Sequence, residues 1–483
     1  MEIIKNKKVY LIYPPISKEE RYSSKIGAAG GNQIPLGIFY LASYLRENGF
    51  EVAVTDGEAE NLQTNDIINI FNDFSPNFIA ISSTTVAFHR AIELARQIKH
   101  NNHNIKIILG GPHITSNVNH ALSFDCFDYG VLREGEITLT ELLNYICEGK
   151  NLYEVKGIAF RNAQNQIIVN KPREYINNLD ILPFPAYDLI KDINLYAPPP
   201  SNYKDLPVVN IITSRGCPGL CTFCDNNVFG RKYRQRSAEN IFREIKYLYD
   251  NYKIKEIAFV DDTLLITKKR LIQLFELLDN EGIYLPWTCM ARINDVNYEL
   301  LKYIKSKGCW HISFGIESAD ETILKTIKKQ LSLEKVEQVI KWCRNLGIKT
   351  KGFFIIGHPG ETIDTINKTI QFACKLKIDD VVATINTPIP GTVQYAEIDK
   401  YGTADITDWS QYNYWRPVFV PKGLSKEILL QKHKEFYKRF YFRPRVIVRY
   451  FKSFFGRGGW RRFISIVEAS KFIFFRNEKN TIK

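Results

Sequence analysis

Two series of alternating strands and helices, separated by a proline-rich crossing, constrain the fold of this chain most. The first series fills residues 1–150 and alternates β-branched runs such as KKVYLIY and FEVAVTD with helical patterns. The second runs from PVVNIIT to DVVATIN and contains six predicted strands. Because alternating strands and helices form parallel sheets covered by helices, we expect an α/β protein. It should hold a doubly wound parallel sheet and then a partial, six-stranded (β/α)6 barrel.

The boundaries between these parts follow from composition. After the first series, KGIAFRN and QIIVN predict a small β-hairpin, and a crossing rich in proline follows that suits neither a helix nor a central strand. Ligands of both architectures bind beyond the carboxyl ends of the strands, so we search for site residues there. We place the doubly wound domain at 1–150, the hairpin and linker at 151–206, the barrel at 207–400 and a helical extension at 401–483.

Composition is that of a globular enzyme. The chain is 45% hydrophobic and 24% charged, which lies in the globular range. No stretch approaches the ~18 consecutive apolar residues of a membrane-spanning helix, and Pro14 comes too early for a secretory signal peptide. Nine cysteines, an odd number and mostly scattered, do not suit a secreted disulfide framework. We therefore expect a cytoplasmic protein.

The positive charge of the chain is concentrated at its end. Residues 431–483 hold 15 Lys and Arg against 3 Asp and Glu, or +12 of the total of +13, interleaved with aromatic rings. Basic segments with Phe and Trp bind anionic membrane surfaces, which predicts peripheral contact with the inner face of the membrane or a lipid-like substrate. Nucleic acid is the weaker alternative, because the rings outnumber what a strand-tracking groove needs. Ordinary helices packed across the open side of the barrel are a second alternative.

Three cysteines stand together in the loop TSRGCPGLCTFCDN, directly after the first strand of the barrel. Cys217, Cys221 and Cys224 have the spacing Cys-x3-Cys-x2-Cys, and Phe223 adds a flat apolar wall between the last two. Three thiolates on one short loop can hold one face of a cubane iron–sulfur cluster and leave one iron free for substrate. A zinc site would need a fourth ligand, and no second Cys or His pair follows. We therefore predict the ligands of a [4Fe–4S] cluster.

This loop on a partial barrel resembles the signature of the radical S-adenosylmethionine superfamily, over roughly residues 207–398. The resemblance implies that the free iron binds S-adenosylmethionine and that an electron from the cluster cleaves it to a 5′-deoxyadenosyl radical. It also implies a partner that donates electrons, such as flavodoxin or ferredoxin. Each nucleotide contact that it implies could instead be a helix cap, an ion pair or a turn. The residues so implicated are Asp262 in FVDD, Arg292, Glu317 and Ser318 in SFGIES, and Gly357 and Pro359 in FFIIGHPGET.

The doubly wound domain ahead of the barrel resembles the cobalamin-binding subclass of that superfamily, through PLGIFYLASYLRENG, GGPHIT and REGE. The resemblance implies cobalamin as a further cofactor. The Asp-x-His-x-x-Gly motif that supplies a histidine to cobalt is absent, since TDGEAEN follows the second strand. His113 could lie near the corrin, but as a lone loop histidine it is more readily a hydrogen-bonded side chain than an axial ligand. The strand-end residues implicated are Thr84, Gly110, Gly111, His113, Glu134 and Gly135.

Two functions remain open. The first is cobalamin-dependent methylation of an unactivated carbon of a hydrophobic substrate, lipid-like or tetrapyrrole. The second is oxidation or cyclisation without methyl transfer, since the layout also resembles anaerobic magnesium-protoporphyrin monomethyl ester cyclase. A tRNA-modifying methylthiotransferase is disfavoured, because Cys126 and Cys147 are too few for a second cluster. The remaining cysteines lie within strand or helix patterns, where a thiol is usually a small buried hydrophobe, although one could donate hydrogen to a substrate radical: Cys289, Cys309, Cys343 and Cys374.

Overall fold

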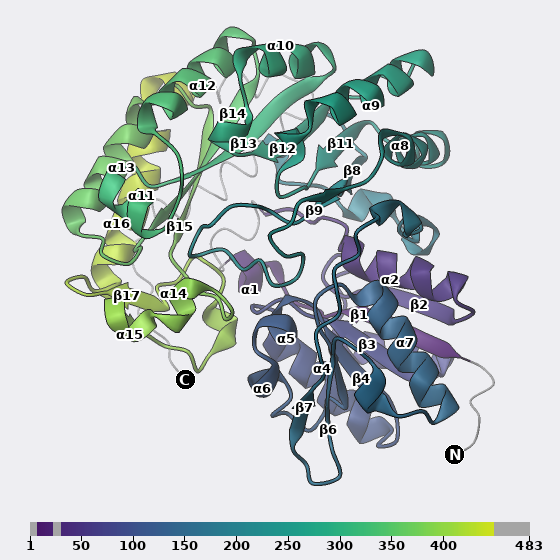
Figure 1. The fold of residues 1–483 in the computed structure, drawn as a ribbon. Helices are drawn as coiled ribbons and strands as arrows, with labels where there is room; N and C mark the ends of the chain where they lie inside the picture. Colours follow the sequence, from purple (N-terminus) through teal and green to yellow (C-terminus); the bar gives the residue numbers. More distant parts are fainter. Residues whose placement is uncertain (1–6, 23–29, 449–483) are drawn as a thin grey trace.

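A computed structural model describes residues 7–22 and 30–448 of the 483. Two α/β units face each other, as Figure 1 shows, and the expected combination of a doubly wound sheet with a partial barrel is confirmed. The basic, aromatic segment 449–483 lies outside the described residues. Within the described ranges, no helix is both long enough and apolar enough to span a bilayer.

The N-terminal unit is built on a seven-stranded sheet in the order β2-β1-β3-β4-β5-β6-β7. The first five strands pair in parallel, and the predicted hairpin adds β6 and β7 antiparallel to one edge. The strand order reverses between β1 and β3, which is where doubly wound sheets bind ligands. The strands are β1 (Lys8–Tyr13), β2 (Glu51–Asp56), β3 (Phe78–Ser82), β4 (Lys106–Gly110), β5 (Tyr129–Val131), β6 (Ile158–Arg161) and β7 (Ile167–Val169).

Both faces of this sheet are covered because successive side chains of a strand point to opposite sides. In β1, Val9 and Leu11 pack in one apolar core, whereas Tyr10 and Ile12 pack in another. Helices α2 (Leu36–Glu47) and α7 (Gly135–Glu148) bury residues in the first core, and α3 (Thr64–Phe74) and α4 (Phe88–Asn101) in the second. The short helices are α1 (Lys18–Tyr22), α5 (Pro112–Ser116) and α6 (Val118–Ala121).

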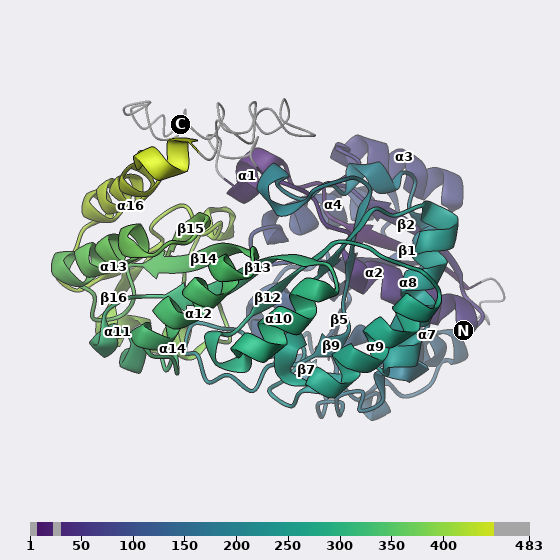
Figure 2. The same ribbon diagram turned by 90° about the horizontal axis from the view of Figure 1, so that it is seen from above.

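The second unit is a six-stranded, fully parallel sheet in the order β15-β14-β13-β12-β11-β8, an open barrel. Figure 2 shows its helices along the outer side of the curved sheet. The strands are β8 (Val208–Ile211), β11 (Glu256–Phe259), β12 (Trp287–Ala291), β13 (Cys309–Glu317), β14 (Lys349–Ile356) and β15 (Asp380–Ile385). The helices are α8 (Ala238–Tyr252), α9 (Lys268–Asn280), α10 (Tyr298–Ser306), α11 (Glu321–Thr326), α12 (Leu333–Asn345) and α13 (Ile363–Lys375).

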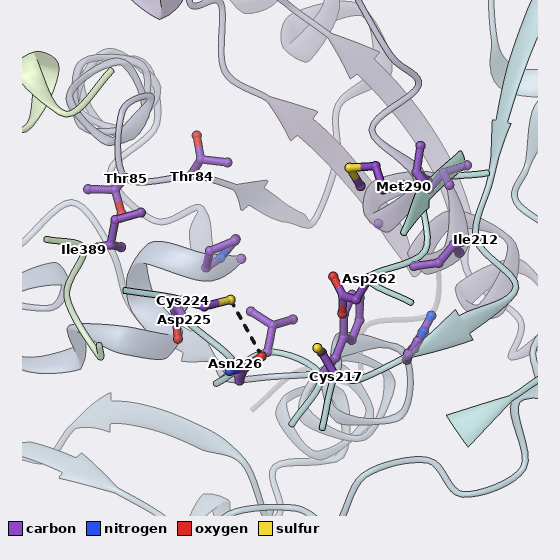
Figure 3. Close-up of a pocket in the computed structure, with 18 of the residues that line it drawn as sticks. Thr84, Thr85, Ile212, Cys217, Cys224, Asp225, Asn226, Asp262, Met290 and Ile389 are labelled. Carbon is purple, nitrogen blue, oxygen red and sulfur yellow. Dashed lines mark hydrogen bonds between the residues drawn. The ribbon is translucent and has the colours of Figure 1, made fainter. Parts of the chain in front are cut away.

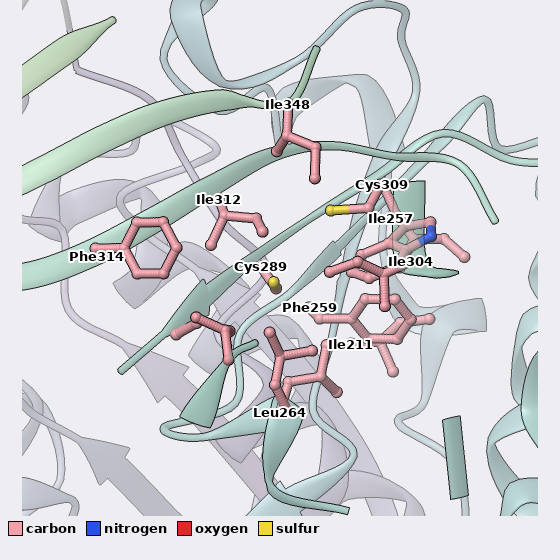
Figure 4. Packing of buried hydrophobic residues seen from close by; sticks show 14 of the residues in the cluster. Ile211, Ile257, Phe259, Leu264, Cys289, Ile304, Cys309, Ile312, Phe314 and Ile348 are labelled. Atoms are coloured by element: carbon pink, nitrogen blue, oxygen red, sulfur yellow. The ribbon is translucent and has the colours of Figure 1, made fainter. Parts of the chain in front are cut away.

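The main apolar core of the chain lies between these strands and their helices. Figure 4 shows Ile211, Phe259 and Phe314 among the packed side chains, with the thiols of Cys289 and Cys309 between them. Both cysteines, and Cys343 on α12, are buried as expected, and Cys374 on α13 is half-buried. The three buried thiols therefore act as small apolar groups in this core.

The linker and the C-terminal region close the barrel at its floor and at one edge. The proline-rich crossing forms short 3-10 turns from Leu179–Ile181 to Pro200–Asn202, and Ser201 there accepts a hydrogen bond from the buried Lys351 of β14 at 3.2 Å. A hairpin of β16 (Gly402–Ala404) and β17 (Phe419–Pro421), which the sequence did not lead us to expect, precedes α16 (Lys426–Tyr441). Helix α16 packs against α13 and β15 and covers the edge of the sheet.

A candidate site between the two sheets

A cavity of about 1120 Å³ lies where the carboxyl ends of both sets of strands face each other. Figure 3 shows Thr84 of the N-terminal unit across from Cys217 and Cys224 of the barrel loop. Residues 412–415 line a further side, where Ile385 of β15 donates its backbone N–H to the Tyr414 carbonyl (2.9 Å). Asn413 also donates to the carbonyl of Glu20, 3.2 Å away on α1, so this segment bridges the two units beside the cavity.

The three cysteines of the loop all line the cavity. Two glycines shape the loop around them. A Cβ on Gly219 would stand 3.3 Å from the Cys217 sulfur and 4.0 Å from the Cys221 sulfur, and a Cβ on Gly216, at φ +90°, would collide with the Lys232 carbonyl at 2.4 Å. A backbone without side chains at these points therefore lets the loop curl tightly next to its thiols.

Two of the three loop thiols have a raised pKa. Burial raises the pKa of the Cys221 thiol, and burial with the neighbouring Cys221 and Asp262 raises the pKa of Cys224 to about 12. A thiol in such surroundings stays protonated until a cation compensates its charge, and coordinated metal deprotonates it outright. Among the described residues no three His, Cys, Asp or Glu side chains converge on the position of a single ion. A cubane cluster does not need its ligands to converge on one point, because each thiolate binds a different iron atom. The three thiols of this loop therefore fit a cubane cluster.

Charged side chains from three other strand ends surround the loop. Asp262, Arg292 and Glu317 line the cavity. A register shift between Gly315 and Glu317 interrupts the end of β13, where Glu317 adopts φ +68°. Arg292 Nε lies 3.9 Å from the carboxylate of Asp295. Burial raises the pKa of Asp262, and the adjacent Asp261 raises it further. The rim of the barrel therefore offers both charges beside the thiols.

Lys329 is the main charged residue at this rim that the sequence analysis missed. Its ammonium lies 2.9 Å from the Glu317 carboxylate and 6.0 Å from the centroid of the Phe223 ring. Burial lowers the pKa of Lys329, but the negative charges of Glu317 and Cys221 raise it by more. The net shift is upward, so the side chain is positively charged at neutral pH. In the sequence Lys329 lies in the run KTIKKQ. This run has the composition of a solvent-exposed helix end, so the sequence does not mark Lys329 as a site residue.

Four predicted residues do not line the cavity: His113, Ser318, Gly357 and Pro359. His113 lies on α5 with its ring buried: the ring stacks on Phe88, with the centroids 4.0 Å apart, and its nitrogens lie 3.3 Å from Thr85 Oγ1 and from His120 Nδ1. Burial lowers its pKa to about 3, so it is a neutral, hydrogen-bonded histidine. The Ser318 hydroxyl meets Thr369 at 3.3 Å.

The structure also places the HPGET motif behind the cluster loop. A Cβ on Gly357, at φ +85°, would lie 3.2 Å from Leu429 of α16. The buried His358 ring lies 5.6 Å from that of Phe223, centroid to centroid. Glu361 accepts hydrogen bonds from the backbone N–H groups of Gly357 and His358. The turn that follows β14 therefore packs against Phe223 of the cluster loop.

The predicted strand-end residues of the N-terminal unit line the cavity apart from His113. Apart from Glu134 they are small. A Cβ on Gly111, at φ +95°, would lie 2.8 Å from the Ser83 carbonyl, and nothing lies closer than 4.0 Å to a Cβ on Gly110. Glycine and threonine leave room for a broad, flat ligand above the strand ends. None of the described histidines lines the cavity, so the residues present fit a cobalamin held without a protein imidazole.

Glu134 lines the cavity, but its carboxylate binds the barrel. It accepts from Arg215 at 2.8 Å, from Arg234 at 2.9 Å and from the backbone N–H of Ile176 at 2.8 Å. Arg215 reaches Glu136 at 2.5 Å with its other terminal nitrogen. All four charged side chains are buried. The REGE segment thus ties the N-terminal unit to the residues directly before Cys217.

Comparisons with known proteins agree with this architecture. The family described as the Radical SAM superfamily matches residues 211–373, and that described as the B12 binding domain matches residues 25–143. An uncharacterized methyltransferase of Pyrococcus horikoshii is 35% identical over 447 residues, which cover 92% of this chain and 94% of that protein. The anaerobic magnesium-protoporphyrin IX monomethyl ester cyclase of Rubrivivax gelatinosus is 26% identical over 428 residues, covering 87% of this chain and 76% of the cyclase.

A solved structure shows the same fold. The radical S-adenosylmethionine methyltransferase TsrM from Kitasatospora setae, with cobalamin and a [4Fe–4S] cluster bound, matches with a TM-score of 0.65 at 16% identity, over 91% of this chain and 90% of TsrM. The chain belongs to the radical S-adenosylmethionine superfamily, in the group whose members carry a B12 binding domain. It is an enzyme, and its cofactors are a [4Fe–4S] cluster, S-adenosylmethionine and cobalamin. When bound, the cluster and S-adenosylmethionine would supply a 5′-deoxyadenosyl radical, and cobalamin would be able to carry a methyl group.

Proposed function

We propose that this enzyme transfers a methyl group through cobalamin to an unactivated carbon of a hydrophobic substrate. The observation that carries the proposal is a single cavity shared by the thiol loop and the strand ends of the B12 binding domain. Radical formation and methyl delivery must act on the same carbon, and a shared cavity holds the substrate against both. The 35% identical relative is itself described as a methyltransferase.

The inner face of the barrel supports a hydrophobic substrate. Five half-exposed or exposed apolar side chains from five of its strands or strand ends point into the cavity, whereas the charged groups stand at the rim. Ser313 and Thr384 add two hydroxyls to this lining. Such a surface buries apolar substrate area and excludes water from a radical. The apolar residues are Ile212, Val260, Met290, Phe353 and Val382.

Oxidative cyclisation without methyl transfer is the second candidate. It is favoured by the similarity to the cyclase, which is named for a magnesium-protoporphyrin ester and covers 87% of this chain. The apolar cavity would suit such a substrate equally well. The two reactions differ in their products, because methylation adds one methylene to the substrate and cyclisation removes hydrogen or adds oxygen.

The test uses enzyme purified without oxygen, with the cluster reconstituted and cobalamin added. S-adenosylmethionine with a deuterated methyl group, a reductant and a lipid or tetrapyrrole extract of the source cells are supplied. We expect 5′-deoxyadenosine, S-adenosylhomocysteine and a product that carries the deuterated methyl. A product that has lost hydrogen and contains no deuterium would establish the cyclase alternative and refute methylation.

We also propose that segment 449–483 brings the enzyme to anionic membranes. This rests on sequence alone, on nine Lys and Arg against two Asp and Glu among Phe, Tyr and Trp residues. A hydrophobic substrate dissolved in the bilayer would then lie close to the cavity.

A further inference from the structure

We propose that the outer side of the thiol loop is the docking surface for an acidic one-electron carrier protein. The proposal rests on the proposed radical chemistry, which consumes an electron from outside the enzyme. We define the docking patch as the exposed side chains of the loop, of the two residues that follow Gly230, and of α11 and its C-terminal end. They are Pro218, Leu220, Arg231, Lys232, Lys325 and Lys328.

The docking patch adjoins the main cavity, because Leu220 and Lys328 line both the cavity and a groove outside it. Leu220, whose side chain is 47% exposed, directly precedes Cys221. It lines the cavity on one side and, on the other, an outer groove of about 400 Å³ that α11 borders. Arg231 donates a hydrogen bond to the Gly219 carbonyl and so lies against the loop itself. Electron tunnelling weakens steeply with distance, so a carrier seated here has a short path to the cluster ligands.

The charge of the docking patch is uncompensated. Lys325, Lys328 and Arg231 form no ion pair with a described residue, and Lys232 donates to the neutral amide of Asn177 at 3.1 Å. Glu321 supplies the negative charge among the described residues of the groove. Cations around an apolar centre suit an acidic partner, because the charges steer the encounter and the apolar residues are buried on contact.

The excess is local and does not simply reflect a basic protein. The whole chain carries +13, of which residues 431–483 carry +12, so residues 1–430 are left with 50 Lys and Arg against 49 Asp and Glu, or +1. Against this nearly neutral background, four exposed cations without an ion pair, on the loop's flank and on α11, form a distinct feature. The redox step needs nothing else: one electron leaves the carrier, which is oxidised, and enters the cluster, which is reduced, with no bond made or broken.

The test uses the reconstituted holoenzyme and reduced flavodoxin as the probe. In the variant Lys232→Glu/Lys325→Glu two cations are reversed without touching a cavity residue. The control Lys302→Glu/Lys341→Glu makes the same change in total charge at exposed positions on α10 and α12. The rate of 5′-deoxyadenosine formation is measured with flavodoxin and, separately, with dithionite, and flavodoxin binding is measured directly by titration.

We expect the patch variant to lose about tenfold or more of the flavodoxin-driven rate at low ionic strength, and to bind flavodoxin correspondingly more weakly. The dithionite-driven rate should not change, and the control should behave as the wild type in all three measurements. Equal flavodoxin affinity in the patch variant and the control would overturn the proposal. So would an equal loss in the dithionite-driven rate, since that would place the defect at the cluster. If the wild type forms no 5′-deoxyadenosine with dithionite, the proposed function fails, and the binding titration still decides the docking surface.

Discussion

At the scale of single residues, the proposed function depends most on the thiols of the cluster loop. We expect Cys217→Ala to lose the bound cluster, since two thiolates on this loop hold a cubane poorly, and with it the formation of 5′-deoxyadenosine. Iron and sulfide analysis after reconstitution measures the first effect, and chromatography of the nucleoside the second. Cys374→Ala is the matched control, because Cys374 lies half-buried on α13 and does not line the cavity. A Cys217→Ala enzyme that retained about four irons and its activity would contradict the assignment of this loop.

Glu361 makes the stability of the fold depend on pH. Burial raises the pKa of its carboxyl from 4.5 to about 8, so between these values the folded state keeps a proton that the unfolded state releases. The free energy of unfolding therefore decreases as pH rises through this window, by at most about 1.4 kcal/mol per pH unit. Glu361→Gln keeps an acceptor for the Gly357 and His358 N–H groups and removes the titration. We expect the variant to gain stability over the wild type as pH rises from about 5 to about 8.

Urea unfolding followed across that pH range tests this expectation. The exposed Glu299→Gln on α10 makes the same chemical change at the surface and should leave the pH profile of the wild type unaltered. Parallel profiles for Glu361→Gln and the wild type would show that the buried carboxyl does not titrate in this window.

Residues of the site were predictable where their spacing is local. The cysteine loop was found because its three thiols lie within eight residues, whereas Lys329 was missed because its role depends on the end of β13 lying beside it. His113 follows a strand as expected, but sequence tells only that a residue lies near a strand end and not to which side its ring turns. Its ring turns from α5 toward Phe88 and His120, which pack against it.

At the level of elements, the REGE turn before α7 and the two-residue strand β9 (Ser214–Arg215) are joined by buried ion pairs. Burial lowers the pKa of Arg215, but the carboxylates of Glu136 and Glu134 outweigh this effect and hold the pKa above its usual value. We expect Arg215→Met to lower the free energy of unfolding by about 3–5 kcal/mol, since it leaves carboxylates buried without their cation.

The same substitution should reduce cluster retention, because Arg215 is two residues from Cys217. Chemical denaturation and iron content of the reconstituted protein measure the two effects. Lys156→Met removes one partner of the exposed pair with Glu174 and should change stability by no more than about 0.5 kcal/mol. If Arg215→Met were as stable as Lys156→Met, the ion pairs would not hold the units together.

Most elements could be predicted from strand–helix alternation, because buried parallel strands have a strong local signature. Both sheets and the hairpin of β6 and β7 were found in this way. The sequence did not predict that this hairpin extends the N-terminal sheet, because pairing at a sheet edge depends on contacts between residues that are distant in sequence. The hairpin of β16 and β17 was not predicted because its strands, Gly402–Ala404 and Phe419–Pro421, contain glycine and proline and no run of alternating β-branched residues.

In the whole molecule, the two sheets meet so that one cavity receives strand ends from both. Neither unit has a complete site alone: the thiols lie on the barrel, the small strand-end residues lie on the N-terminal unit, and residues 412–415 come from beyond the barrel. The buried ion pairs of Arg215 and Arg234 and the contact of Asn413 with α1 fix this arrangement. Because the two sheets face each other, the strand ends of both line a single cavity.

The distribution of charge over the whole chain predicts where the enzyme works. Segment 449–483 carries a net +7, nine Lys and Arg less two Asp and Glu, and each cation near an anionic surface contributes about 1 kcal/mol. We expect the full chain to sediment with vesicles that contain phosphatidylserine, and to be released as salt rises. A chain that ends at residue 448 should remain in solution. Equal sedimentation of both chains would contradict a membrane role for the segment, and binding to neutral vesicles at high salt would show that the aromatic rings, not the charges, make the contact.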